Sequence, residues 1–278
     1  MPVVVVTDAS SRLPADLLEK WSIRVVPLHI LLDGRDLRDG VDDIPDEIYQ
    51  QHATTAAATP AELANAYQQA LADSGGDGVV AVHLSSALSG TYGAAQRTAA
   101  DLDANVRVVD SRSAAMGTGF VALAAARAAA DGGDLCAVAG AASSAVSRGH
   151  AFVVVHRLDN LRRSGRIGGA TAWLGTALAL KPLLRIDDGK LVLAQRVRTV
   201  TAATAAMIDR VCEVVGENSA ALAVQHVANP EGANEVAAEL ARRLPACEPA
   251  IVSPLGPVLG LHVGPGAVAV CLDLAPGG

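Results

Sequence analysis

The sequence predicts an α/β fold of two domains, a Rossmann-like N-terminal domain with a parallel sheet and a C-terminal α+β domain with a mixed sheet. In the first half, short apolar runs alternate with helical patterns, which is typical of parallel strands joined by right-handed crossovers. In the second half, the turn signal Asp187–Gly189 separates two apolar runs and indicates a hairpin. The 278 residues suffice for two domains. We place them at 1–150 and 151–278, with residues 45–75 open to packing with either one.

The first half carries clear start and stop signals for its elements. Thr59, Pro60 and Glu62 form a capping box with proline at the first helical position. The turn signal Asp33–Gly34 ends an apolar run. The predicted elements are apolar strand-like runs at Val3–Val6, Ile23–Leu32, Val79–Leu84, Val106–Val109 and Phe152–Val155, and helices near 14–21, 59–72, 91–102, 114–130 and 135–146.

Three of the predicted strands end in polar residues, at Thr7–Asp8, Ser85–Ser86 and Asp110–Ser111. The carboxyl ends of parallel strands meet at one edge of a sheet, and α/β proteins bind their ligands there. We therefore expect a binding site at this edge. No spacing of acidic residues indicates a metal site, so we interpret the aspartates as capping residues.

The second half mixes a hairpin with helices and further strands. Its predicted elements are hairpin strands over Lys181–Ile186 and Lys190–Val197, helices near Ala202–Val215 and Glu231–Leu244, and strands over Ala221–Val227, Ala250–Ser253 and Ala267–Leu272.

The most informative stretch is Val79–Gln96, in which an apolar run leads into a hydroxyl-rich turn and then an Ala-rich segment. We call this turn the serine turn; it contains Ser85, Ser86, Ser89, Gly90 and Thr91. Helix capping alone explains one serine, but several hydroxyls beside a glycine exceed what capping needs. Hydroxyls, backbone N–H groups and the helix dipole together favour an anion site for a carboxylate or phosphate.

Two further motifs carry polar chemistry. His262 stands among glycines in Leu261–Gly266, which predicts a shaped loop in which an imidazole donates to a carboxylate or exchanges a proton. The segment Leu161–Gly169 concentrates arginines and glycines, and Arg196 and Arg198 share a strand face. Arginine offers forked donors, so this cluster is either a solvated basic turn or an anion or partner contact.

Composition excludes several classes of protein. The net charge of −7 and the 3% aromatic content argue against nucleic-acid binding. No phosphate-binding loop or nucleophile elbow occurs, and we expect no metal, no cofactor, no membrane insertion and a cytoplasmic location. The four cysteines lack metal or redox spacing, and we expect them to be small buried hydrophobes: Cys136, Cys212, Cys247 and Cys271.

Six motifs in order along the chain resemble the DegV family of bacterial lipid-binding proteins. They are Val4–Pro14 (VVVTDASSRLP), Val82–Tyr92 (VHLSSALSGTY), Val109–Gly117 (VDSRSAAMG), Leu161–Pro182 with its G-R-I followed by a helix and K-P, Gln195–Thr199 (QRVRT) and His262–Ala267 (HVGPGA). The resemblance implies two α/β domains with one long-chain fatty acid buried between them.

The resemblance also implies the roles of individual residues. The residues that it places at the fatty-acid carboxylate are Thr55, Ser85, Ser86, Gly90, Thr91 and His262. The bound acid would be presented to a separate fatty-acid kinase that forms an acyl phosphate, with Arg166 and Arg198 contacting the phosphate or the kinase. The chain would then be a carrier and not an enzyme by itself, and we expect it to be a monomer.

One departure from the family pattern lies before the second predicted helix. The family often has T-S-Q-P-S/T-P, whereas this chain has alanine at Ala56–Ala58, so polar groups near the carboxylate are lost. Two alternatives stay open. One is a small-molecule phosphotransferase or hydrolase that uses His262 and a serine; the other is a lipid sensor that binds a regulatory protein through Arg162–Arg166.

Overall fold

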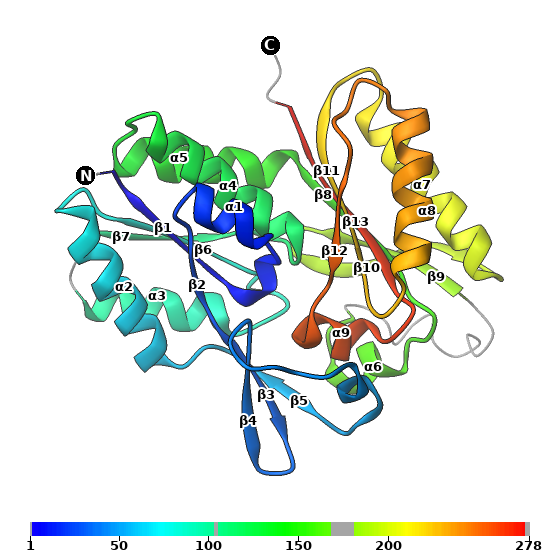
Figure 1. The fold of residues 1–278 in the computed structure, drawn as a ribbon, viewed down its shortest axis with the longest axis horizontal. Helices are drawn as coiled ribbons and strands as arrows, with labels where there is room; N and C mark the ends of the chain where they lie inside the picture. Colours follow the sequence, from blue (N-terminus) through cyan, green and yellow to red (C-terminus); the bar gives the residue numbers. More distant parts are fainter. Residues whose placement is uncertain (1, 103–104, 168–180, 276–278) are drawn as a thin grey trace. The chain divides into compact units, whose positions relative to one another are not determined.

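The computed structural model describes residues 2–102, 105–167 and 181–275 (Figure 1). The chain divides into two compact units. The first unit consists of Met1–Ile44 and His52–Ser147, and the second of Pro45–Gln51 and Arg148–Gly278. The short segment Pro45–Gln51 therefore packs with the second unit although both of its flanks belong to the first.

The first unit is built on a four-stranded sheet in the order β2-β1-β6-β7. Its strands are β1 (Val4–Asp8), β2 (Arg24–Val26), β6 (Val79–His83) and β7 (Val106–Asp110), and all three pairings are parallel. Every residue of β6 is buried, as a central strand covered on both faces requires. The predicted parallel sheet is confirmed.

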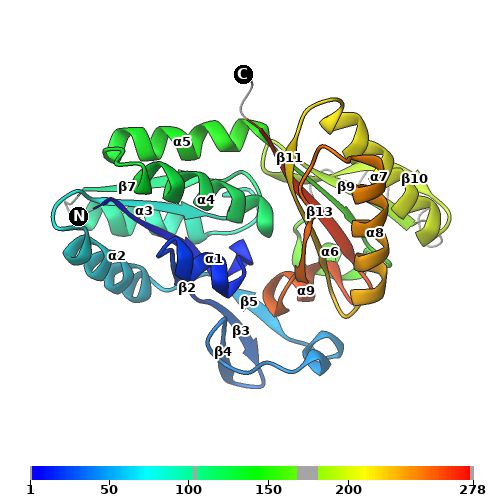
Figure 2. The same cartoon turned by 45° about the horizontal axis from the view of Figure 1, so that its top comes forward.

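Helices cover both faces of this sheet. They are α1 (Ala15–Lys20), α2 (Pro60–Ser74), α3 (Thr91–Asp101), α4 (Met116–Ala130) and α5 (Leu135–Arg148). Figures 1 and 2 show α4 and α5 on one face, with α2 and α3 on the other. The predicted capping box of α2 is confirmed, because the Thr59 side chain and the Glu62 side chain each accept from the other's backbone N–H.

The apolar run Ile23–Leu32 is not a single element. It divides at Pro27 into β2 and β3 (Leu28–Leu32), which belong to different sheets. Proline has no N–H to donate to a strand ladder, which accounts for the break. β3 pairs antiparallel with β4 (Arg35–Asp39) and β5 (Thr54–Ala56) in a small three-stranded sheet that we call the ribbon.

The second unit is built on a six-stranded mixed sheet in the order β10-β9-β8-β13-β11-β12. Its strands are β8 (Gly149–Val154), β9 (Lys181–Asp187), β10 (Lys190–Val197), β11 (Ala220–His226), β12 (Ile251–Pro254) and β13 (Val268–Leu274). The pairing of β11 with β12 is parallel and the other pairings are antiparallel. The predicted hairpin at Asp188–Gly189 is confirmed by the antiparallel pairing of β9 with β10.

Two long helices, α7 (Val200–Val215) and α8 (Pro230–Arg243), pack on one face of this sheet (Figure 2). Their apolar faces form one core with β8, β11 and β13. Three short helices complete the described part of the unit: η2 (Asp46–Gln50), α6 (Asp159–Ser164) and α9 (Pro257–Val263). The helix expected after the G-R-I motif falls on 168–180, outside the described residues.

The prediction that all four cysteines are buried is wrong. Cys271 is buried in β13, but Cys136 is exposed, and Cys212 and Cys247 are half-buried. Cys136 lies in the first turn of α5, whose buried residues are Val138, Ala142 and Ala145, so its exposure depends on packing and not on the residue type.

Candidate carboxylate-binding site

The serine turn follows β6 at the carboxyl edge of the first sheet, and Ser85, which is buried, begins it. The Ser85 N–H donates to the Ser113 carbonyl at 2.8 Å, and the Ser85 hydroxyl accepts from the Ala87 N–H at 3.2 Å. The Ser85 carbonyl accepts from the N–H groups of Leu88 and Ser89, each at 3.0 Å. Ser85 therefore closes the turn as well as supplying a hydroxyl to it.

Ser86 is exposed, and its backbone N–H already has an acidic neighbour. That N–H lies 3.3 and 3.4 Å from the two carboxylate oxygens of Asp110, at the end of β7. Asp110 also accepts from the Arg112 N–H at 2.9 Å. An anionic ligand at this turn must displace Asp110 from the Ser86 N–H or rely on the hydroxyls.

Thr91 and Gly90 differ in what they contribute to the turn. Thr91 is buried, and its hydroxyl lies 2.9 Å from that of Ser89. Gly90 is exposed with ordinary right-handed helical angles, and an added Cβ would meet nothing within 4 Å. Neither the backbone nor the space at this position requires glycine, and the place of Gly90 at the carboxylate stays a prediction.

A chain of three buried polar side chains leads up to the serine turn. Asp8, His83 and Tyr67 are each 0% exposed. The Asp8 carboxylate lies 2.9 Å from His83 Nδ1 and accepts from the backbone N–H groups of Leu84 and Ser10, both at 3.0 Å. His83 Nε2 lies 2.7 Å from the Tyr67 hydroxyl. Burial, with the charge of Asp8, raises the pKa of Tyr67, so the phenol stays protonated.

Sequence reasoning identified only part of this cluster. Asp8 was expected as a cap, and it does cap η1 (Ala9–Ser11). His83 and Tyr67 were not singled out, although a histidine that closes an otherwise apolar strand was a usable signal. The predicted meeting of the three strand ends is confirmed, because Asp8 contacts Leu84 and Asp110 contacts Ser86.

Thr55 lies in the ribbon and not in the serine turn. It is half-buried in β5 and pairs with Ile30 of β3, next to the pairing of His29 with Ala56. The alanines that replace the family's polar residues therefore begin inside β5, where Ala56 is exposed.

His29 connects the ribbon to the start of α2. Its Nδ1 lies 2.7 Å from Asp36, and its Nε2 lies 2.8 Å from Glu62 Oε2. The same Glu62 oxygen accepts from the Thr59 N–H at 2.9 Å. Burial lowers the pKa of His29, but the hydrogen bonds and charges of Asp36 and Glu62 outweigh burial, and the pKa is raised.

His262 lies in the last turn of α9 in the second unit, so the prediction of a loop is wrong. Pro257 stands at the first helical position, and Gly264, at a φ of 82°, follows the last. Proline starts and glycine ends a helix readily, which explains why this Gly-rich stretch is helical. Burial and the positive charge of Arg166 lower the pKa of His262 to about 4, so the imidazole is neutral at pH 7.

Arg166 follows α6, and α6 packs against α9. The Arg166 guanidinium donates to the Ser164 carbonyl at 2.5 Å. The structure therefore brings Arg166 near His262, as their electrostatic coupling requires. Arg198 is exposed just beyond the end of β10, which stops at Val197, so only Arg196 of the two arginines lies in the strand; their shared face stays a prediction.

Apart from Arg198, the predicted site residues thus fall into three local groups. The serine-turn group contains Ser85, Ser86, Gly90 and Thr91, and Thr55 belongs to the ribbon of the same unit. His262 and Arg166 form a pair in the second unit.

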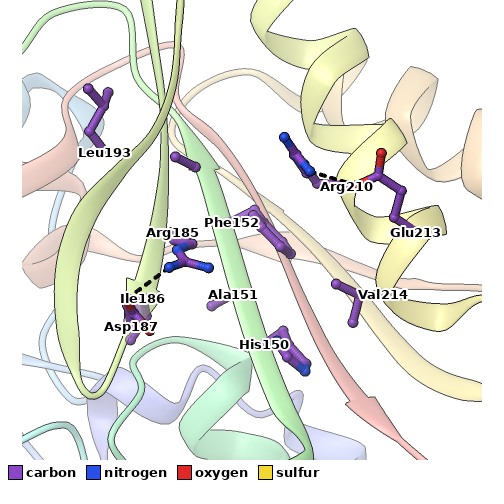
Figure 3. A pocket seen from close by; sticks show the side chains of 11 residues that line it. His150, Ala151, Phe152, Arg185, Ile186, Asp187, Leu193, Arg210, Glu213 and Val214 are labelled. Atoms are coloured by element: carbon purple, nitrogen blue, oxygen red, sulfur yellow. Dashed lines mark hydrogen bonds and ion pairs between the residues drawn. The ribbon is translucent and has the colours of Figure 1, made fainter.

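A pocket of about 440 Å³ lies within the second unit, between the sheet and α7 (Figure 3). Phe152, Leu193 and Val214 contribute apolar surface to it. Its rim carries two ion pairs, Arg185 with Asp187 at 2.9 Å and Arg210 with Glu213 at 2.7 Å. The lining contains no residue predicted to bind the carboxylate, and it differs from the apolar cavity that the family resemblance implies.

Residues 2–102, 105–167 and 181–275 contain no group of three or more histidine, cysteine and acidic side chains arranged to bind a metal ion. The same residues also contain no helix that is both long and apolar enough to traverse a bilayer.

A family model and a similar protein sequence both point to the same family. A family model described as "Uncharacterised protein, DegV family" matches residues 2–274. A DegV domain-containing protein of Mycobacterium tuberculosis is 74% identical over 274 residues, which cover 99% of this chain and 98% of the relative.

Solved structures of the same family have the same fold. A DegV family protein of Thermus thermophilus, described as binding fatty acid, is 31% identical with a TM-score of 0.89, over 99% of this chain and 100% of the relative. DegV of Bacillus subtilis, described as a fatty acid binding protein, is 28% identical with a TM-score of 0.89 over the same shares of both chains.

Proposed function

Because the chain belongs to the DegV family, we propose that it binds one long-chain fatty acid and presents the carboxylate to a separate fatty-acid kinase. The similar structures from Thermus thermophilus and Bacillus subtilis are described as binding fatty acids, and the similarity extends over nearly the whole of each chain. This supports lipid binding as the general activity. The kinase partner and the acyl phosphate go beyond fatty-acid binding and are our own proposal.

The observation that carries the proposal is the serine turn at the carboxyl edge of the parallel sheet. Ser86 is exposed at this turn, and the buried Ser85 and Thr91 contribute two further hydroxyls to it. Charge-assisted hydrogen bonds from such groups stabilise a carboxylate. We assign the head group to Ser85, Ser86, Thr91, Thr55 and His262, and Gly90 contributes only its backbone.

His262 acts in this proposal as a neutral hydrogen-bond donor. Its pKa of about 4 means that the ring carries no charge at neutral pH, and one of its nitrogens carries a proton to donate. The positive charge for a developing acyl phosphate comes instead from Arg166 and Arg198, which face either the phosphate or the kinase. The proposal needs no metal or cofactor on this chain, because the kinase would bind the nucleoside triphosphate whose terminal phosphoryl group is transferred to the carboxylate oxygen, with the nucleoside diphosphate leaving.

The acyl tail supplies most of the binding free energy. Burial of each methylene contributes about 0.8 kcal/mol, so about sixteen carbons gain roughly 12 kcal/mol before the costs of association and ordering. A buried apolar cavity for one chain is therefore sufficient for tight binding without a strong head-group interaction. The head group then determines the orientation of the acid and its delivery to the kinase.

Native mass spectrometry of the purified protein, followed by lipid extraction, tests the binding step. We expect one fatty acid per monomer. The combined variant Ser85→Ala with Ser86→Ala, and the single variant His262→Ala, should lower occupancy. The matched control replaces two exposed serines of α5 whose hydroxyls bond only to their own helix, Ser143→Ala with Ser147→Ala. Full occupancy in both site variants would refute the head-group assignment.

Acyl-phosphate formation with an added fatty-acid kinase tests whether the protein presents the bound carboxylate to that kinase. Arg166→Gln and Arg198→Gln should slow it without loss of bound acid, whereas Arg242→Gln on the exposed face of α8 should not. Turnover of an ester or phosphate by the isolated protein, lost in His262→Ala, would instead support the hydrolase or phosphotransferase alternative.

A further inference from the structure

We propose that the buried chain Asp8–His83–Tyr67 is a positioning network that holds the serine turn in its ligand-binding form. The inference rests on the proposed function of that turn. None of the three side chains reaches the surface, since each is 0% exposed. They therefore act on a ligand only through the backbone that they fix.

The network fixes the three residues that enter the turn. The His83 carbonyl accepts from the Ser111 N–H at 3.0 Å, and the Leu84 N–H donates to Asp8 at 3.0 Å. The Ser85 N–H then donates to Ser113. The bond from Leu84 to Asp8 therefore lies between two main-chain bonds to the segment after β7, and the three bonds together restrain the backbone that carries Ser85.

The hydrogen bonds determine the tautomer of His83. Asp8 Oδ2 accepts a hydrogen bond from the Nδ1–H group at 2.9 Å, and Nε2 then accepts one from the Tyr67 hydroxyl at 2.7 Å. Asp8 Oδ1 is occupied by the N–H and hydroxyl of Ser10. In this arrangement each side-chain polar atom of Asp8, His83 and Tyr67 has a hydrogen-bond partner. A buried polar network needs such pairing in order to be stable.

Three apolar side chains would fill the same space without any requirement for pairing. Replacing a buried polar pair by well-packed apolar residues is often neutral or stabilising, so we attribute Asp8 and His83 to the geometry that they fix and not to a gain in stability. The Asp8 carboxylate fixes the backbone conformation of residues 83–85. These residues lead directly into the hydroxyls that we assign to the ligand. The hydrogen bond between His83 and Asp8 is therefore the one that affects ligand binding. The hydrogen bond from Tyr67 only holds the imidazole ring of His83 in place.

Two substitutions at His83 separate these links. In His83→Asn the amide nitrogen can replace Nδ1 and donate to Asp8, whereas in His83→Gln the longer side chain reaches toward Tyr67 and leaves Asp8 without that donor. With palmitic acid as the probe, we expect His83→Gln and Asp8→Asn to weaken binding about tenfold or more, and His83→Asn and Tyr67→Phe to weaken it about threefold or less. His150→Gln, a half-buried histidine of the second unit, is the control.

Nitrogen-15 NMR of the wild-type imidazole supplies a measurement that needs no variant. We expect a proton on Nδ1 of His83, and slow exchange of the Leu84 amide that becomes fast in Asp8→Asn. A proton on Nε2 alone, or equal palmitate affinities of His83→Asn and His83→Gln, would overturn the inference. Wild-type protein that binds no palmitate would refute the proposed function instead, while the tautomer and the amide exchange would still decide whether the network fixes the turn.

Discussion

Gly260 in α9 is the position at which one added methyl group should disturb the helix that carries His262. A Cβ built there would lie 2.4 Å from Tyr49 Cε1, 2.9 Å from Cζ and 3.1 Å from the hydroxyl oxygen. Tyr49 belongs to η2, in the Pro45–Gln51 segment that packs with the second unit. Gly260→Ala therefore forces the tyrosine ring or α9 to move.

The expected change in the free energy of unfolding caused by Gly260→Ala has two opposing parts. Alanine in place of glycine stabilises a helix interior by about 0.5–1 kcal/mol, whereas overpacking costs about 1–3 kcal/mol. Removal of the ring in Tyr49→Ala should abolish the second part, so Gly260→Ala should then stabilise α9. The coupling between the two substitutions is thus about 1–3 kcal/mol, the cost of the overpacking itself.

Native-state hydrogen exchange measures this coupling locally. The amides of Gly260 and Gly264 report on it, because they donate within α9 to the carbonyls of Gly256 and Gly260 at 2.9 and 2.8 Å. Gly140→Ala calibrates the helix term, since Gly140 is an exposed position of α5 where a Cβ meets nothing within 4 Å. Equal effects of Gly260→Ala with and without Tyr49 would show that the ring does not hold α9.

Two predictions concern histidines. The pKa of His29 is raised above 6.5 by its contacts with Asp36 and Glu62. The stabilisation that these contacts give the first unit should be complete below pH 6.5 and should be lost as the pH rises through the raised pKa. Urea unfolding measured against pH should show this loss in the wild type and not in His29→Gln. Arg166→Gln should raise the pKa of His262 from about 4 toward 6.5 without reaching it, because burial remains; NMR titration measures the shift, and an unchanged pKa would contradict the assigned role of Arg166.

Much of the fold could be predicted because its signals are local. The alternation of apolar runs with helices gave the parallel sheet, the Thr59–Glu62 pair gave the start of α2, and Asp188–Gly189 gave the hairpin. Each depends on residues close together in the chain. Errors arose where one residue changed the outcome, as Pro27 did by dividing a continuous apolar run between two sheets.

The sequence by itself determined the hydroxyl-rich turn after β6, its place at the carboxyl edge of a parallel sheet, and the family to which these motifs point. Only the tertiary structure decided what surrounds those groups: Asp110 at the Ser86 N–H, Asp8 and His83 before the turn, and Arg166 beside His262. Asp8 and His83 are 75 positions apart in the chain, and no pattern of spacing encodes a contact at that separation. Hydrogen bonding and burial act through space, so the protonation and orientation of these groups follow from packing and not from the order of residues.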